Sequence, residues 1–460
     1  MKKLVYQLLP RLWKNGRFSG VDADTLKYLK DILGMDVLWC TGVIRHATGA
    51  TEKVVKGEAG SPYAITDYFD VNPYLADDPA HRMEEFEALV GRVHGAGLKL
   101  LIDFVPNHVA RENVNFSGDD FYYYPGEALR LPVEAKGYEE FPARASGNAF
   151  TPAPGINDWW ETVRLNYGDV HSDTWDKMLD VILFWIARGV DGFRCDMVEM
   201  VPPAFLKWLI ARVKKYHPEV LFVAEVYQRD KYAFYANEVG FDWLYDKCGL
   251  YDTLRAVTCN GASAREITAA WQALGPLQPR MLNFLENHDE QRIASDFFCG
   301  KPENAYAALA VSLLLNEAPF MVYFGQEAGE RGMQQEGFSG LDGRTSIFDW
   351  CKVPALEKPN EKVLARYSDI LFWAKTPAFA KGKSYDLCYC QQEGFNPDRH
   401  FAFIRSDGVN HYLVVANFGP KRDITVRIPQ EALDYLGITL GKTHHVLEVP
   451  EKDYVLIHLQ

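Results

Sequence analysis

Apolar residues recur along this chain in short runs with the character of β-strands. Eight such runs precede residue 330, and turn-forming or polar residues follow them. They cover residues 4–8, 37–43, 99–105, 192–197, 221–227, 241–246, 281–286 and 320–325. Short apolar runs bounded by turn signals are typical of buried parallel strands.

Helical patterns lie between several of these runs. Apolar residues repeat at three- and four-residue spacing over 83–93 and again over 205–213. Gly95 and Gly97 stop the first pattern, and Pro218 follows the second. Strands that alternate with amphipathic helices predict an α/β fold, and eight repeats predict a (β/α)₈ TIM barrel.

Two stretches interrupt the alternation. Residues 111–168 are rich in glycine, proline and aromatics, including FYYYPG and Trp159-Trp160, and predict a small inserted domain after the third strand. From residue 378 the pattern has a period of two, which predicts a C-terminal all-β sandwich domain. The expected domains are therefore a barrel over 1–110 and 169–377, an insertion over 111–168, and a β-domain over 378–460.

Acidic residues follow four of the strand-like runs. Asp103, Asp196, Glu225 and Asp289 stand at or just beyond their ends, and 29 residues separate the second acid from the third. The C-terminal ends of barrel strands meet on the face that carries active sites. The pattern therefore predicts an enzyme whose chemistry depends on carboxylates.

Two of these acids have contrasting neighbours. Arg194 and Asp196 are two residues apart on one strand, so they face the same side, and the cation favours an ionised Asp196. Apolar residues flank Glu225 and should raise its pKa. An ionised nucleophile beside a protonated acid is what a retaining glycosidase requires. A buried salt bridge is the structural alternative for Arg194 and Asp196.

The segments DFVPNH, GFRCD, VAEV and ENHD, in this order and spacing, resemble the four signature segments of the α-amylase superfamily, glycoside hydrolase family 13. RLNYG at 164–168 and PFMVYFGQE near the eighth strand extend the resemblance over almost the whole chain. It implies a retaining α-glycoside hydrolase of amylase type, acting on α-1,4-glucans or maltodextrins through a covalent glycosyl-enzyme.

The resemblance also implies a role for each matching residue. Asp196 would be the nucleophile, Glu225 the general acid/base, and Asp289 the third carboxylate, which binds sugar hydroxyls. Asp103 would position Arg194, and Tyr63 would form an aromatic platform under the sugar, although a core tyrosine is the alternative. The residues expected to hydrogen-bond that sugar are His108, Arg194 and His288.

Two departures from the family pattern, and one match that concerns calcium, limit what carries over. Glu199 and Met200 stand where many members have Lys-His, which leaves the acceptor-side contacts open. Ser61-Pro62-Tyr63 replaces a His-Gly-Tyr segment. Asn107 matches a ligand of structural calcium, so a calcium site is possible under the resemblance, although no cofactor is expected to be required.

Composition and charge indicate which partners and which cellular location to expect. A net charge of −13 argues against nucleic acid as a partner, and no apolar run reaches the length of roughly 18 residues that a membrane span needs. Pro10 and Arg11 interrupt the first apolar run, which indicates a strand and not a signal peptide. Eight scattered cysteines without a CxxC pair favour thiols and a cytoplasmic location. The expected partner is an oligo- or polysaccharide, and the sequence does not indicate an oligomeric state.

Other functions remain open at this stage. An α-glucanotransferase or a glucoside isomerase would use the same scaffold, because hydrolysis and transfer share the covalent intermediate. A sugar-binding protein with an inactive barrel belongs to a different class. It would be expected to lack an acid of the triad, and all three are present.

Overall fold

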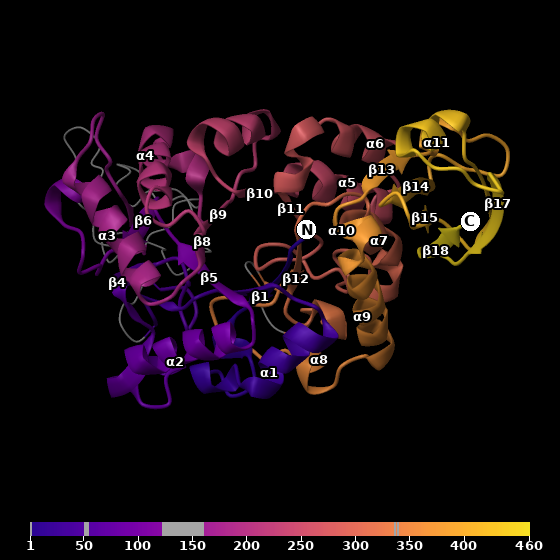
Figure 1. The fold of residues 1–460 in the computed structure, drawn as a ribbon. Coiled ribbons are helices and arrows are strands. Elements are labelled where there is room, and N and C mark those ends of the chain that lie inside the picture. The colour runs from indigo at the N-terminus through magenta and orange to yellow at the C-terminus, as the bar shows by residue number, and fades with distance from the viewer. Residues whose placement is uncertain (1, 50–54, 122–160, 335–336, 338–339) are drawn as a thin grey trace.

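Eight parallel strands close into a barrel in the computed structural model, which describes residues 2–49, 55–121, 161–334, 337 and 340–460 (Figure 1). Around the barrel the strands follow the order β1, β2, β5, β8, β9, β10, β11, β12, and β12 pairs again with β1. Their bounds are β1 Leu4–Leu8, β2 Val37–Cys40, β5 Lys99–Phe104, β8 Gly192–Cys195, β9 Leu221–Ala224, β10 Trp243–Tyr245, β11 Met281–Phe284 and β12 Phe320–Tyr323. Every predicted barrel strand is confirmed.

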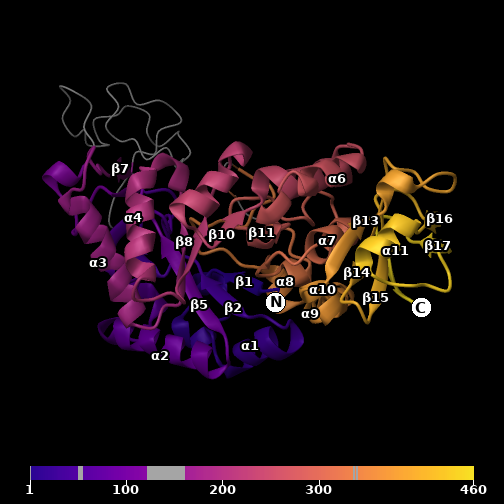
Figure 2. The ribbon, with the colours of Figure 1, turned by 45° about the horizontal axis from the view of Figure 1, so that its top comes forward.

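Helices surround the barrel (Figures 1 and 2). Both predicted amphipathic segments are helical, and α2 buries Phe86, Leu89 and Val93 against the strands. The helices of the barrel are α1 Ala23–Lys27, α2 Arg82–Gly95, α3 Asp173–Ala187, α4 Pro203–Lys214, α5 Asp252–Cys259, α6 Arg265–Gln272, α7 Tyr306–Leu314, α8 Pro354–Glu357, α9 Glu361–Lys375 and α10 Pro377–Ala380. Because the apolar residues of α2 recur every three to four positions, they form one face of the helix, and this face covers the sheet.

The strand register brings the predicted acids together. Asp103 of β5 lies opposite Arg194 of β8, and Cys195 of β8 lies opposite Ala224 of β9. Asp196 and Glu225 are the first residues beyond β8 and β9. Neighbouring strand ends lie about 4.8 Å apart, so the two carboxyls emerge side by side on the C-terminal face.

Two excursions leave the barrel on this face. The sequence pattern did not indicate the first, an antiparallel pair of β3 Ile44–His46 and β4 Ile65–Val71 after β2. The second begins with β6 His108–Ala110, which pairs with β7 Thr162–Arg164 within the expected insertion. Of the aromatic stretches noted there, residues 122–126 and Trp159-Trp160 lie outside the described residues.

The C-terminal region contains two sheets and one short helix. A four-stranded sheet has the order β13, β14, β15, β18, and β16 pairs with β17. The bounds are β13 Lys383–Asp386, β14 His400–Ser406, β15 His411–Asn417, β16 Arg422–Arg427, α11 Gln430–Leu436, β17 His444–Val449 and β18 Tyr454–Leu459. Phe401 and Phe403 face the barrel core, whereas Ala402 and Ile404 face the second sheet. The period-two prediction is confirmed, and α11 is an addition that it did not anticipate.

In the described part of the chain, no helix combines the length and the apolar character needed to cross a membrane.

Candidate active site

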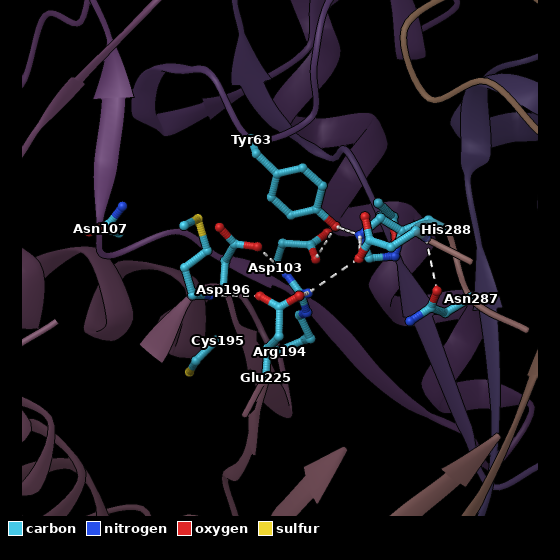
Figure 3. A network of polar contacts seen from close by, with 12 residues as sticks. Tyr63, Asp103, Asn107, Arg194, Cys195, Asp196, Glu225, Asn287 and His288 are labelled. Carbon is cyan, nitrogen blue, oxygen red and sulfur yellow. Dashed lines mark hydrogen bonds and ion pairs between the residues drawn. The ribbon is translucent and has the colours of Figure 1, made fainter. Parts of the chain in front are cut away.

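Arg194 lies at the centre of the acidic cluster (Figure 3). Its buried guanidinium places Nη1 2.5 Å from Oδ1 of Asp196 and Nη2 2.7 Å from Oε1 of Glu225. Oδ2 of Asp289 is 4.0 Å from Nη2. Arg194 and Asp196 point into the cluster, and Cys195 between them points away, as the strand alternation requires. One cation therefore bridges the two acids that the sequence paired.

Three aromatic rings enclose this guanidinium. Its carbon lies 5.7 Å from the ring centroid of Trp39, 5.4 Å from that of Tyr63 and 5.5 Å from that of Tyr245. Arg194 Nε also donates to the Tyr245 hydroxyl at 3.3 Å. Ring faces attract cations, and the attraction is stronger away from water. The cage and the carboxylates thus hold the guanidinium in one orientation.

Burial raises the pKa of each triad acid. For Asp196 and Glu225, desolvation outweighs the lowering effect of Arg194. For Asp289, burial and the Glu225 charge raise the pKa well above its usual range. For Glu225, the raised pKa agrees with the direction expected from its apolar neighbours. For Asp196 the lowered pKa expected from its arginine neighbour is corrected, because the loss of solvent around the carboxyl outweighs the cation.

Both oxygens of Glu225 accept a hydrogen bond. Oε2 accepts from the Met197 N–H at 2.7 Å, and Oε1 accepts from the Tyr227 hydroxyl at 2.9 Å. The Asp196 and Glu225 carboxyls both contact the same guanidinium, at 2.5 and 2.7 Å, and so lie on one side of the site.

His288 connects the third acid, Asp289, to Gln7 of β1. Its Nδ1 lies 2.8 Å from Gln7 Nε2, which donates, so the neutral ring carries its hydrogen on Nε2. That Nε2 is 2.5 Å from the Tyr63 hydroxyl and 3.2 Å from Oδ2 of Asp289. Burial and Arg194 lower the pKa of His288 well below its usual value, so the ring is a neutral donor.

Tyr63 is buried, and both its ring and its hydroxyl have partners. The ring stacks on His288 with centroids 5.2 Å apart and planes at 21°. The hydroxyl contacts His288 and donates to Oδ1 of Asp103 at 3.3 Å. Besides the ring expected to form a platform, Tyr63 therefore has a hydroxyl that links two site residues.

Asp103 accepts hydrogen bonds from Tyr63 and from the backbone of Gly42. Its Oδ2 accepts from the Gly42 N–H at 3.3 Å, and no ion pair within 4.0 Å joins it to Arg194, both being described residues. Burial raises the pKa of Asp103 to about 7, against the lowering effect of Arg194. The arginine's ion pairs are with the acids beyond β8 and β9, and Asp103 interacts with it through charge alone, so the positioning of Arg194 by Asp103 stays a prediction.

His108, the first residue of β6, and Asn107 lie just before the expected insertion. His108 is buried, and burial lowers its pKa to about 4, so the ring is neutral. Asn107 Nδ2 lies 3.2 Å from His108 Nδ1, and the Asn107 backbone carbonyl accepts from the Leu165 N–H at 3.0 Å. In Figure 3 Asn107 stands apart from the acidic cluster. The described residues contain no group of three or more His, Cys, Asp and Glu side chains that could hold a metal.

Several residues of the site were not anticipated from the sequence. Gln7, Trp39 and Tyr245 point inward from barrel strands, and Tyr227 follows the acid/base candidate. Each stands in or beside a strand-like run. A large or polar side chain near the C-terminal end of a barrel strand is the sequence signal that could have identified these residues. Their apolar surroundings made packing the simpler explanation.

Comparison with known proteins identifies the family. The α-amylase catalytic domain profile matches residues 11–128 and 161–362, more than half of the chain. The chain therefore belongs to the α-amylase family.

Individual relatives agree with this assignment. The α-amylase MalA of Haloarcula japonica is 31% identical over 346 residues, which cover 72% of this chain and 45% of that protein. An α-1,4-glucan:maltose-1-phosphate maltosyltransferase of Cereibacter sphaeroides is 28% identical, with coverage of 55% of this chain and 37% of that protein. The chain thus spans about half or less of the length of these curated relatives.

Solved structures share the fold over nearly the full length. The cyclic α-maltosyl-(1→6)-maltose hydrolase of Arthrobacter globiformis superposes with a TM-score of 0.73 at 21% identity, covering 99% of this chain and 98% of that one. An α-amylase of Lactobacillus plantarum gives a TM-score of 0.70 at 22% identity, with the same coverage.

Proposed function

We propose that this protein is a retaining α-glycoside hydrolase that cleaves α-1,4-linked glucans or maltodextrins. The observation that carries the proposal is the guanidinium of Arg194, which contacts Asp196 and Glu225 at 2.5 and 2.7 Å. Two close, buried carboxyls at neighbouring strand ends suit double displacement, in which no water stands between nucleophile and sugar.

In the proposed reaction Asp196 attacks the anomeric carbon while Glu225 protonates the departing oxygen. The Arg194 cation lowers the pKa of Asp196 against the effect of burial and so favours the attacking anion. Burial keeps the pKa of Glu225 raised, as a general acid needs. Glu225 then removes a proton from the water that releases the sugar from Asp196.

Asp289 and His288 are proposed to bind sugar hydroxyls beside the cleaved bond. Their contact at 3.2 Å brings a carboxyl and a neutral N–H donor together. The proposed cleavage subsite also contains His108, Arg194 and Tyr63. Tyr63 would both line the subsite and, by stacking on His288, hold that ring in place.

Product analysis on maltoheptaose tests this function. Chromatography with and without an added sugar acceptor should show shorter maltooligosaccharides as the main products in both cases. Products longer than the substrate in the presence of acceptor would favour a glucanotransferase, and absence of turnover on every α-glucoside would contradict the proposal.

A cytoplasmic location is a further proposal. All eight cysteines lie in the described part of the chain as free thiols, which supports a cytoplasmic location. No cofactor is required for the proposed reaction; if calcium is bound, Asn107 would be a ligand, because its side-chain oxygen is the atom type that calcium prefers.

A further inference from the structure

A carboxylate outside the triad joins the two loops that carry Asp196 and Glu225. Glu199 lies in the turn just after Asp196, and its oxygens accept two consecutive backbone N–H groups beyond Glu225. Oε2 accepts from Tyr227 at 2.8 Å, and Oε1 accepts from Gln228 at 3.2 Å. Strand β9 has ended at Ala224, so the barrel ladder no longer fixes this segment.

The turn that carries Glu199 depends on an uncommon backbone conformation. Met197, between Asp196 and this turn, has φ 47° and ψ 41°, a left-handed backbone conformation that residues other than glycine rarely adopt. The same residue donates its N–H to Oε2 of Glu225 at 2.7 Å. Tyr235 supports the turn by donating its hydroxyl to the Val198 carbonyl at 3.3 Å.

Tyr227 connects the Glu199 contact to the acid/base. Its backbone N–H binds Glu199, and its hydroxyl donates to Oε1 of Glu225 at 2.9 Å. Burial and the Glu225 charge raise the pKa of the Tyr227 phenol well above its usual value, so it remains a donor. Both oxygens of Glu225 are therefore held by groups that depend on the contact between the two loops.

We propose that Glu199 is a positioning residue that fixes the orientation of Glu225 relative to Asp196 by bonding the backbone after β9 to the turn after β8. The inference rests on the proposed function, since it assigns Glu199 a role in the alignment of that carboxyl pair. Glu199 acts through Tyr227 and Met197 and does not itself bond either acid.

Loss of the contact should affect turnover more than binding. Misplacement of a reacting group by about 1 Å costs on the order of 100-fold in rate. Glu199→Ala should therefore lower kcat by about 10- to 100-fold with less than about a threefold change in KM. Glu199→Gln keeps one acceptor oxygen and should recover part of the loss.

The pH profile should move in a defined direction. Hydrogen bonds from Met197 and Tyr227 stabilise the ionised form of Glu225 and lower its pKa. Weakening them raises this pKa, so the alkaline limb of kcat/KM should move to higher pH in Glu199→Ala and in Tyr227→Phe. A residue that only stabilised the fold would leave this limb in place.

The experiment compares wild type, Glu199→Ala, Glu199→Gln, Tyr227→Phe and the double variant Glu199→Ala/Tyr227→Phe on maltoheptaose across pH. Glu238→Ala is the matched control, because Glu238 is exposed and pairs at 3.8 Å with Lys207 on the outside of the barrel. The double variant should lose less than the product of the single losses, since both residues act on Glu225.

Three results decide the proposal. A lowered kcat with a shifted alkaline limb in Glu199→Ala and an unchanged Glu238→Ala supports it. Wild-type kcat and pH profile in Glu199→Ala overturn it while leaving the proposed function intact. If the wild type cleaves no α-glucoside, hydrogen–deuterium exchange still decides, because Glu199→Ala should speed exchange at residues 226–228, and unchanged exchange contradicts the contact.

Discussion

Two buried arginines of this protein hold their charge in opposite ways. Arg194 at the end of β8 lies against the carboxylates of Asp196 and Glu225. In the described part of the chain, the side chain of Arg405 of β14, where the C-terminal region meets the barrel, donates only to the backbone carbonyls of Leu315, Ala378 and Phe379, at 3.0, 3.2 and 2.9 Å. Burial lowers the pKa of Arg405 to about 10. For Arg194 burial has the same effect, but Glu225 first, then Tyr245, Tyr63 and Asp196, raise its pKa well above the usual value.

The difference separates a structural contact from an electrostatic one. Neutral carbonyls satisfy the hydrogen bonds of a guanidinium without balancing its charge, so Arg405 joins segments of backbone. Carboxylates balance the charge, and the guanidinium in turn lowers their pKa. Changes at Arg405 should therefore affect stability, and changes at Arg194 should affect chemistry.

Removal of one acid from the Arg194 pair should have the largest effect. Asp196→Asn and Glu225→Gln should each lower kcat on maltoheptaose by at least about 10³-fold, since a covalent catalyst or its proton donor is lost. α-Maltosyl fluoride separates the two roles, because its leaving group needs no protonation: Glu225→Gln should release one equivalent of fluoride and accumulate the glycosyl-enzyme, whereas Asp196→Asn should release none. More than a tenth of wild-type activity in Asp196→Asn would exclude it as the nucleophile.

Replacement of the bridging cation should lower activity less but change the pH profile. Arg194→Met should reduce kcat/KM by about 10²- to 10³-fold. Arg194 lowers the pKa of both Asp196 and Glu225, so its removal raises both values and both limbs of the profile should move to higher pH. Arg194→Lys is the control, because it keeps the charge but not the planar fork. Unchanged limbs in Arg194→Met would contradict the electrostatic role.

Arg405→Met should give the opposite result. Carbonyls that lose their buried donor destabilise the fold, so the free energy of unfolding should fall by about 1–3 kcal/mol. Thermal denaturation measures this loss, and kcat of the folded enzyme should stay close to wild type. A lowered kcat with unchanged stability would remove the distinction between the two arginines.

Tyr63 provides the smallest and most specific test near Arg194. Tyr63→Phe keeps the ring over His288 but removes the hydroxyl that contacts His288 and Asp103. It should lower kcat/KM by about tenfold, and Tyr63→Ala by about 100-fold, because it also removes the ring. If Tyr63→Phe were equal to wild type, the hydroxyl would have no part in the alignment of His288.

The sequence predicted the barrel and the acids better than the contacts among them. Strand periodicity located all eight barrel strands, because parallel strands buried on both faces carry a strong apolar signal. It did not indicate the β3–β4 pair, whose residues 44–46 are too few for a period-two pattern. The partner of Asp103 and the contact of Glu199 depend on loop geometry beyond strand ends, which no local pattern encodes.

The stereochemistry of the product tests the central claim most directly. If Asp196 forms a covalent glycosyl-enzyme and Glu225 then activates water, two inversions give net retention. An NMR time course of maltooligosaccharide cleavage should therefore show the α-anomer first, with the β-anomer appearing later by mutarotation. Initial release of the β-anomer would contradict double displacement by this carboxyl pair.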